Sequence, residues 1–227
     1  MDSAKETTVQ NGSWTTGQIL EYRHQVNKGV EAGIPREFIE NELSKDTFQS
    51  YLSPDGKNTE QRMAEACRLT DLIFSAATNW AFKGVYLVVE GESTVAREYV
   101  SRVCLFRGII ARSMYPARVG YTVTMSELAG ILIGSSPMYR TNYTETLKRV
   151  PVVYVKDLDP VKELKDWSGS REVFDGLLNG REISNLPTII SVTGGLEQMS
   201  GVAERYGAKV GDIFTPGKDT TIWLKTG

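Results

Sequence analysis

The eight residues from Gly91 to Glu98, with the sequence GESTVARE, follow an apolar run and precede an amphipathic stretch. They fit the frame of the phosphate-binding loop, G-x-x-x-x-G-K-[ST], in which backbone amides cradle phosphates while the lysine and the hydroxyl handle charge and metal. Gly91 keeps the first glycine, whereas Ala96, Arg97 and Glu98 replace the second glycine, the lysine and the hydroxyl. The spacing therefore indicates a nucleotide site whose reactive residues have changed.

Each replacement alters what the loop can bind. The methyl group of Ala96 lies where the backbone must approach phosphate, and Arg97 keeps the positive charge but brings a bulkier planar fork. The carboxylate of Glu98 can bind a metal, yet it would repel a phosphate about 4 Å away by about 4 kcal/mol at an intermediate dielectric. The alternative is an ordinary strand-to-helix turn, with Ser93 and Thr94 as helix N-caps. The candidate nucleotide-binding residues are Gly91, Glu92, Ser93, Thr94, Val95, Ala96, Arg97 and Glu98.

The composition limits what else the chain can be. Its 227 residues suit one large domain, and a 41% share of hydrophobic residues suffices for a packed core. A formal net charge of -2 gives no general attraction to nucleic acid or acidic membranes. Cys67, Cys104 and the single histidine, His24, form no metal or disulfide pattern, so no metal site is expected. The lack of a signal peptide and of a membrane-spanning run predicts a cytoplasmic protein without a membrane partner.

The elements that must position the loop alternate along the chain. Apolar runs predict strands over 85–89, 119–124, 150–155, 188–192 and 220–225. Three- and four-residue apolar spacing predicts a helix that begins at Ser126 and helices over 17–31, 36–43, 58–81, 95–114, 170–182 and 196–205. Residues 134–146 look rich in loops, and residues 1–15 are polar and expected to be mobile. Strands that alternate with helices predict an α/β fold with a mainly parallel sheet covered on both faces.

In such a sheet, ligands bind beyond the carboxyl ends of the strands. Residues 90–98, 155–159 and 192–195 lie at the ends of three predicted strands. We therefore expect these segments to share one edge of the sheet, and any chemistry to lie there.

Five segments in order resemble the AAA+ helicase-loader family, which includes DnaC, DnaI and the related transposon ATPase IstB. They are AGIPREFIENEL, FKGVYLVVEGESTVARE, RVPVVYVKDLD, FDGLLNGREISNLPTIISVTGGLEQM and AERYGAKVGDIF, and the resemblance runs from Ala32 to about Lys225. It implies a P-loop NTPase-like (AAA+) core over 32–227, with a mainly parallel sheet between helices and no separate lid domain. A flexible extension over 1–31, with room for one helix, would precede this core.

The resemblance also implies where the remaining site residues lie. The family's pair of acidic residues falls on Lys156 and Asp157, so that only the second acid is kept. The polar sensor falls on Thr193, and the arginine finger falls on Lys209, which supplies charge without bidentate geometry. Asp157, Thr193 and Lys209 are thus the candidate catalytic residues, within motifs that have drifted from the family's pattern.

Two of the changed positions belong together in the intact family fold, where the loop hydroxyl and the first acid face the same magnesium ion. Those positions are Glu98 and Lys156 in this chain. We hypothesise that the two side chains form an ion pair in the place of the metal, partly exposed because a buried pair is costly to desolvate. The alternative is two independent surface substitutions.

The joint changes favour a non-hydrolysing AAA+-like protein over an efficient ATPase. It would act as an adaptor, loader-like factor or regulator in DNA replication or mobile-element biology, without a required cofactor. Its partner would be a replicative helicase, a related AAA+ ATPase subunit or copies of itself. Residues 1–31 are too few for the separate helicase-binding module of the family's loaders, which counts against helicase loading itself.

Two other functions stay open. One is an active ATP-dependent helicase loader with an atypical P-loop, in which Arg97 binds the phosphate of ATP with magnesium and Asp157 acts in hydrolysis. The other is a simple nucleic-acid-binding module that contacts single-stranded DNA. Side chains suited to it are Arg97, Arg102, Arg107, Arg112, Arg118, Tyr115, Tyr121, Tyr139 and Tyr143. Arginines five residues apart lie on different faces of a helix and form no single stripe, so most are expected to be solvated or paired.

Overall fold

In a computed structural model of the chain, five strands form one sheet in the order β2-β3-β4-β1-β5, and every neighbouring pair is parallel. The structure describes residues 16–43, 80, 86–112, 119–158, 170–193, 206–215 and 221–226. The strands are β1 (Tyr86–Gly91), β2 (Gly120–Thr124), β3 (Val152–Leu158), β4 (Thr188–Thr193) and β5 (Thr221–Lys225). No helix within the described ranges is long and apolar enough to cross a lipid bilayer.

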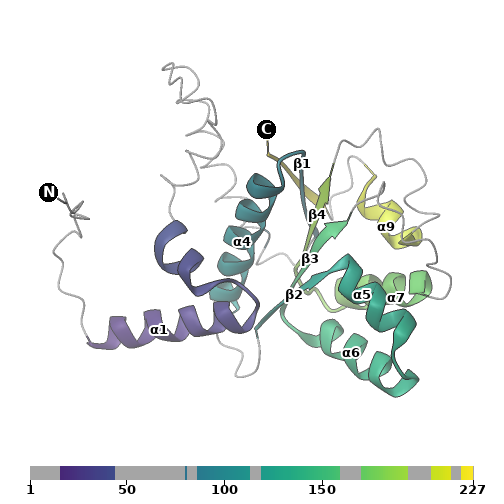
Figure 1. The fold of residues 1–227 in the computed structure, drawn as a ribbon, viewed down its shortest axis with the longest axis horizontal. Helices are drawn as coiled ribbons and strands as arrows, with labels where there is room; N and C mark the ends of the chain where they lie inside the picture. The colour runs from purple at the N-terminus through teal and green to yellow at the C-terminus, as the bar shows by residue number, and fades with distance from the viewer. Residues whose placement is uncertain are drawn as a thin grey trace, which may run out of the picture.

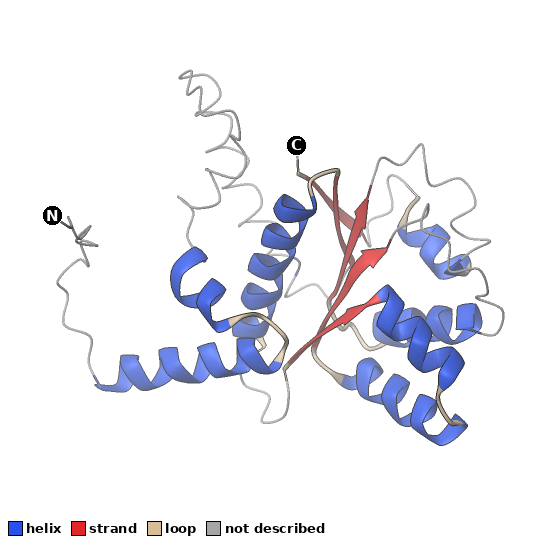
Figure 2. Ribbon diagram, viewed as in Figure 1, coloured by secondary structure: helices blue, strands red, loops and turns tan. Residues whose placement is uncertain are grey.

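Helices cover both faces of this sheet, as Figures 1 and 2 show. They are α1 (Thr16–Glu31), the π-helix η1 (Phe38–Glu42), α4 (Thr94–Ala111), α5 (Met125–Gly134), α6 (Pro137–Arg149), α7 (Ser170–Ile183) and α9 (Ala208–Ile213). Leu87 and Val89 of β1 join an apolar cluster with α1, η1 and α4. Tyr86 and Val88 join a second cluster with α5, α6, α7 and α9. The alternation follows from the pleat of the strand, and it confirms the predicted three-layer α/β fold.

The five predicted strands are confirmed to within a few residues at each end. β3 runs further than predicted, through Leu158, because the polar residues at positions 156 and 157 continue the strand. The predicted helices over 17–31, 95–114 and 170–182 match α1, α4 and α7. Apart from Trp80, the predicted helices over 58–81 and 196–205 lie outside the described residues.

The segment 134–146, predicted to be rich in loops, instead forms most of α6, so that prediction is wrong. Few apolar residues mark this helix, but it has strong local start signals. The hydroxyl of Ser136 accepts a hydrogen bond from the Tyr139 backbone N–H at 3.4 Å, and Pro137 is preorganised for the first turn. Leu147 packs into the core on the inner face.

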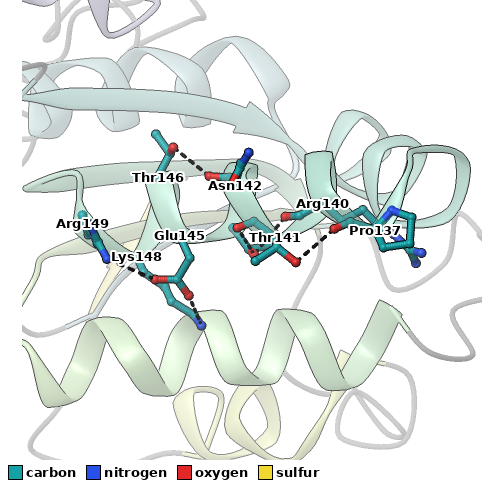
Figure 3. A network of polar contacts seen from close by, with 9 residues as sticks. Pro137, Arg140, Thr141, Asn142, Glu145, Thr146, Lys148 and Arg149 are labelled. Carbon is teal, nitrogen blue, oxygen red and sulfur yellow. Dashed lines mark hydrogen bonds and ion pairs between the residues drawn. The ribbon is translucent and has the colours of Figure 1, made fainter.

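Several polar side chains along α6 form contacts within the helix itself (Figure 3). Glu145 accepts a hydrogen bond from Lys148 at 2.9 Å and lies 3.8 Å from Arg149. The hydrogen bond from Lys148 lowers the pKa of the Glu145 carboxyl. Two hydroxyls donate to carbonyls four residues earlier, Thr141 to Pro137 at 3.0 Å and Thr146 to Asn142 at 2.8 Å. These bonds give both hydroxyls an acceptor within the helix.

Arg181 of α7 is a fully buried charge that joins three elements of this layer. Burial lowers its pKa to about 9, so the guanidinium is still charged at neutral pH. It donates hydrogen bonds to Leu147 O at 2.5 Å, Val150 O at 2.7 Å, Pro151 O at 3.4 Å, Pro187 O at 2.7 Å and Thr188 Oγ1 at 2.8 Å. The side chain therefore ties the end of α6 and the starts of β3 and β4 to α7.

We predict that Arg181→Met lowers the free energy of unfolding by about 3–5 kcal/mol, because buried acceptors lose their donor. Urea denaturation followed by circular dichroism would measure this loss. Arg171→Met, at an exposed position of the same helix, should change it by no more than about 0.5 kcal/mol. Equal effects of the two substitutions would show that the carbonyl contacts of Arg181 contribute no special stability.

Candidate functional site

The carboxyl ends of β1, β3 and β4 lie next to one another, as expected for 90–98, 155–159 and 192–195 as far as the structure describes them. Gly91 at the end of β1 is paired with Thr193 at the end of β4, and Leu158 of β3 is paired with Val192. The loop then enters α4 through Ser93, whose hydroxyl accepts a hydrogen bond from Ala96 N at 3.3 Å. Ser93 is therefore the predicted N-cap, and the whole 91–98 frame lies at this edge.

The Arg97 side chain turns back into its own loop. Its guanidinium donates hydrogen bonds to Gly91 O, to Thr94 Oγ1 at 3.2 Å and to Thr193 Oγ1 at 3.0 Å. Arg97 is only 3% exposed. The residue predicted to replace the loop lysine is thus a cation bound to the protein itself, and Thr193, the predicted sensor, is one of its acceptors.

Glu98 and Lys156 form the ion pair that the sequence led us to hypothesise. Lys156 Nζ lies 2.7 Å from Glu98 Oε1, and the two side chains are about a quarter exposed, at 24% and 23%. Arg102, one helical turn along α4, lies 2.5 Å from the same oxygen. Two cations therefore face one carboxylate, which offsets much of the repulsion that Glu98 alone would exert on a phosphate.

The residues at the family's acidic positions lie in an irregular part of β3. Val155 is paired with Ile190 and Leu158 with Val192, so β3 carries one more residue than β4 between these pairs. Such a bulge changes the direction in which side chains point. It falls on Lys156 and Asp157, and the side chain of Asp157 lies outside the described part of the structure.

The glycine at the start of the loop has a reason that does not involve phosphate. A Cβ atom at position 91 would collide with the hydroxyl and the carbonyl oxygen of Thr226. Thr226 is held there because its backbone N–H and its hydroxyl donate to Glu90 O at 2.8 and 3.1 Å. The chain after β5 thus packs over the turn, and this packing alone requires glycine.

Lys209, at the arginine-finger position, lies away from the other candidate residues. Its ammonium pairs with Glu182 and lies 5.6 Å from the centre of the Tyr86 ring. Tyr86 begins β1, whereas the loop follows the other end of that strand, roughly 17 Å away at 3.3 Å per residue. The Lys209 backbone N–H also donates to Asp175 at 2.5 Å. Within one chain, Lys209 therefore joins α9 to α7 and does not reach the loop.

Two contributors to this edge were missed from the sequence. Arg102 could have been found, because it stands four residues after Glu98 on a predicted helix, and such pairs face each other. Thr226 could not, because its contact with Gly91 depends on how β5 pairs with β1. Lys225 was predicted to end the strand, and the residue after it gave no signal of its own.

The residues present do not fit a magnesium ion held as in an intact P-loop. Its two protein ligands would come from positions 98 and 156, where a carboxylate and an ammonium bind each other. The loop cation that would meet the phosphates is already bound to three protein oxygens. We therefore derive no reaction step through a metal-bound nucleotide.

Comparison with solved structures finds this fold in helicase loaders. The chain matches the DnaC helicase loader with a TM-score of 0.54 at 19% identity, over 81% of this chain and 100% of that one. DnaI matches with a TM-score of 0.52 at 19% identity, over 81% and 94% of the two chains. A Streptococcus pyogenes serotype M3 protein, proposed to be a primosome component, matches with a TM-score of 0.53 at 15% identity, over 89% of this chain and 96% of that one. At these identities the likeness shows the fold, a DnaC-like P-loop NTPase fold.

Comparisons at the level of sequence give no relative. No protein-family model matches the chain, and a search of curated proteins finds no significant match.

We predict a coupling free energy of about 0.5–1 kcal/mol between Glu98 and Lys156, because the pair is partly shielded from water. A double-mutant cycle of Glu98→Gln and Lys156→Met, read by urea denaturation, would measure it, and high salt should weaken it. The Glu145–Arg149 pair is more exposed and 3.8 Å apart, so the same cycle there should give nearly zero. Equal couplings for both pairs would contradict the prediction.

Proposed function

We propose that the chain is a non-hydrolysing adaptor of the helicase-loader type, which binds a replicative helicase or a related AAA+ ATPase subunit. The first support is the fold, which it shares with the DnaC helicase loader and with DnaI. This shared fold is the reason that we propose a helicase-type partner. The second support is the altered chemistry at the edge of the sheet where a nucleotide would lie.

The proposal that the protein does not hydrolyse ATP rests on the Glu98–Lys156 ion pair. P-loop ATPases hold magnesium through the loop hydroxyl and an acidic residue, and the metal neutralises charge that develops on the phosphates. A carboxylate already bound by two cations is a poor metal ligand, and an ammonium beside it repels a dication. Without this metal, efficient phosphoryl transfer is not expected.

The exposed start of α1 is the surface that we assign to the protein partner. The last turns of α1 pack in the core through Val26, whereas its first turns extend beyond α4 (Figure 1). Leu20 is 60% exposed there and Ile19 is 38% exposed. A helix that presents apolar side chains in this way suits an apolar groove on another protein.

A second candidate function is contact with single-stranded nucleic acid at the junction of β2 and α6. The rings of Tyr139 and Tyr143 stack with centroids 6.3 Å apart, and Tyr121 meets Tyr143 edge to face at 6.0 Å. Tyr139 is more than half exposed and offers a stacking surface for a base. The nearby Arg140 donates to Leu132 O at 3.1 Å, so part of its guanidinium is already engaged.

For nucleotide chemistry, we predict no magnesium-dependent phosphate release above background and no magnesium-dependent ATP binding by calorimetry. The matched variant Ala96→Gly/Arg97→Lys/Glu98→Thr/Lys156→Asp restores the residue types of an intact loop and of the first acid, and it should gain magnesium-dependent binding. Turnover by the wild-type chain that disappears in Asp157→Asn would instead support the active helicase loader.

For the partner, we predict that Ile19→Glu/Leu20→Glu weakens binding to a purified replicative helicase of the native host about tenfold or more, because a charge enters an apolar contact. Ile183→Glu, at an 84% exposed position on α7, is the matched control and should bind like the wild type. Capture from the host lysate identifies the helicase to titrate. A steeply salt-dependent affinity for single-stranded DNA, with no helicase binding, would favour the second candidate.

A further inference from the structure

Arg97 makes a set of contacts that the loss of hydrolysis does not require. The Glu98–Lys156 pair alone is the basis of the proposed loss of hydrolysis, and it requires no contact from Arg97. The guanidinium is nevertheless buried and, among the described residues, donates only to neutral oxygens, Gly91 O, Thr94 Oγ1 and Thr193 Oγ1. Burying a charge is costly unless it is hydrogen-bonded. These three acceptors satisfy the two terminal nitrogens of Arg97, whereas its Nε has no partner among the described residues.

The three acceptors belong to three different elements at the edge of the sheet. Gly91 is the last residue of β1, Thr94 is the first residue of α4, and Thr193 is the last residue of β4. In a nucleotide-loaded P-loop, phosphates accept from the loop and the loop lysine donates to them. Here the arginine donates to the loop itself and to the neighbouring strand.

We propose, building on the function proposed above, that Arg97 is an internal latch that takes the place of the nucleotide. Its guanidinium holds the 91–97 turn against the end of β4, so the edge keeps one conformation whether or not nucleotide is present. Regulation of this edge is therefore uncoupled from ATP. Arg97 acts as a positioning residue, through Thr94 and Thr193.

The latch depends on the planar fork of arginine and on the Thr193 hydroxyl. Lysine carries the same charge but presents one ammonium, which cannot reach acceptors on both sides of the loop with the geometry of a guanidinium. Valine at position 193 keeps the shape of threonine and removes only the acceptor. The two substitutions therefore test the link without opening a large cavity.

Hydrogen exchange read by mass spectrometry measures local opening of the segments 91–97 and 188–193. We expect unchanged exchange in the wild-type chain when ATP and magnesium are added. Arg97→Ala and Thr193→Val should each raise exchange in both segments roughly tenfold, since each removes a hydrogen bond to a charged group. Arg97→Lys should fall between the wild type and Arg97→Ala. Arg107→Ala, at an exposed position of the same helix, should leave both segments unchanged.

The double variant Arg97→Ala/Thr193→Val separates a latch from two independent packing effects. If the residues act as one link, the double variant exchanges no faster than Arg97→Ala alone; additive effects overturn the proposal. Wild-type rates in Thr193→Val, or slower wild-type exchange with ATP and magnesium, overturn it as well. Should Arg97→Ala fail to fold, Thr193→Val and Arg97→Lys still decide the matter. None of these results depends on phosphate release or helicase binding, so the adaptor proposal stands or fails separately.

Discussion

A buried guanidinium needs hydrogen-bond acceptors. This chain buries two such groups, one at the amino ends and one at the carboxyl ends of the strands of its sheet. Arg181 donates to four carbonyls and to Thr188, the first residue of β4. Arg97 donates to the loop after β1 and to Thr193, the last residue of β4. The strand between β1 and β3 is therefore fastened at both ends by buried charge, and the layers on either face are built around it.

The two fastenings differ in what they connect. At the amino ends of the strands, Arg181 joins backbone segments that any chain of this topology must hold together, so its role is structural. The carboxyl edge is where parallel α/β sheets bind ligands. There Arg97 contacts the turn after β1 and the end of β4, and Glu98 pairs with Lys156. The fold of a loader is thus combined with a site whose charges satisfy one another, which is why we place function in protein contacts.

The sheet could be predicted because buried parallel strands are apolar runs that the sequence shows directly. The Glu98–Lys156 pair could also be predicted, because the family fold directs both positions at one metal. α6 could be predicted only from the start signals of Ser136 and Pro137, because apolar spacing does not mark it. The direction of the Arg97 side chain could not be predicted, because its acceptors come from segments far apart in the chain. Arg181 was overlooked, although it continues the apolar stripe of Phe174 and Leu178.

The packing of Thr226 over Gly91 has a practical consequence for studying this protein. Whatever is covalently attached behind Thr226, whether a fluorophore, a cross-linker or an affinity tag, leaves the chain beside the turn that follows β1. A dye placed there becomes a reporter of events at that edge. A bulky group at the same point would obstruct that edge of the sheet.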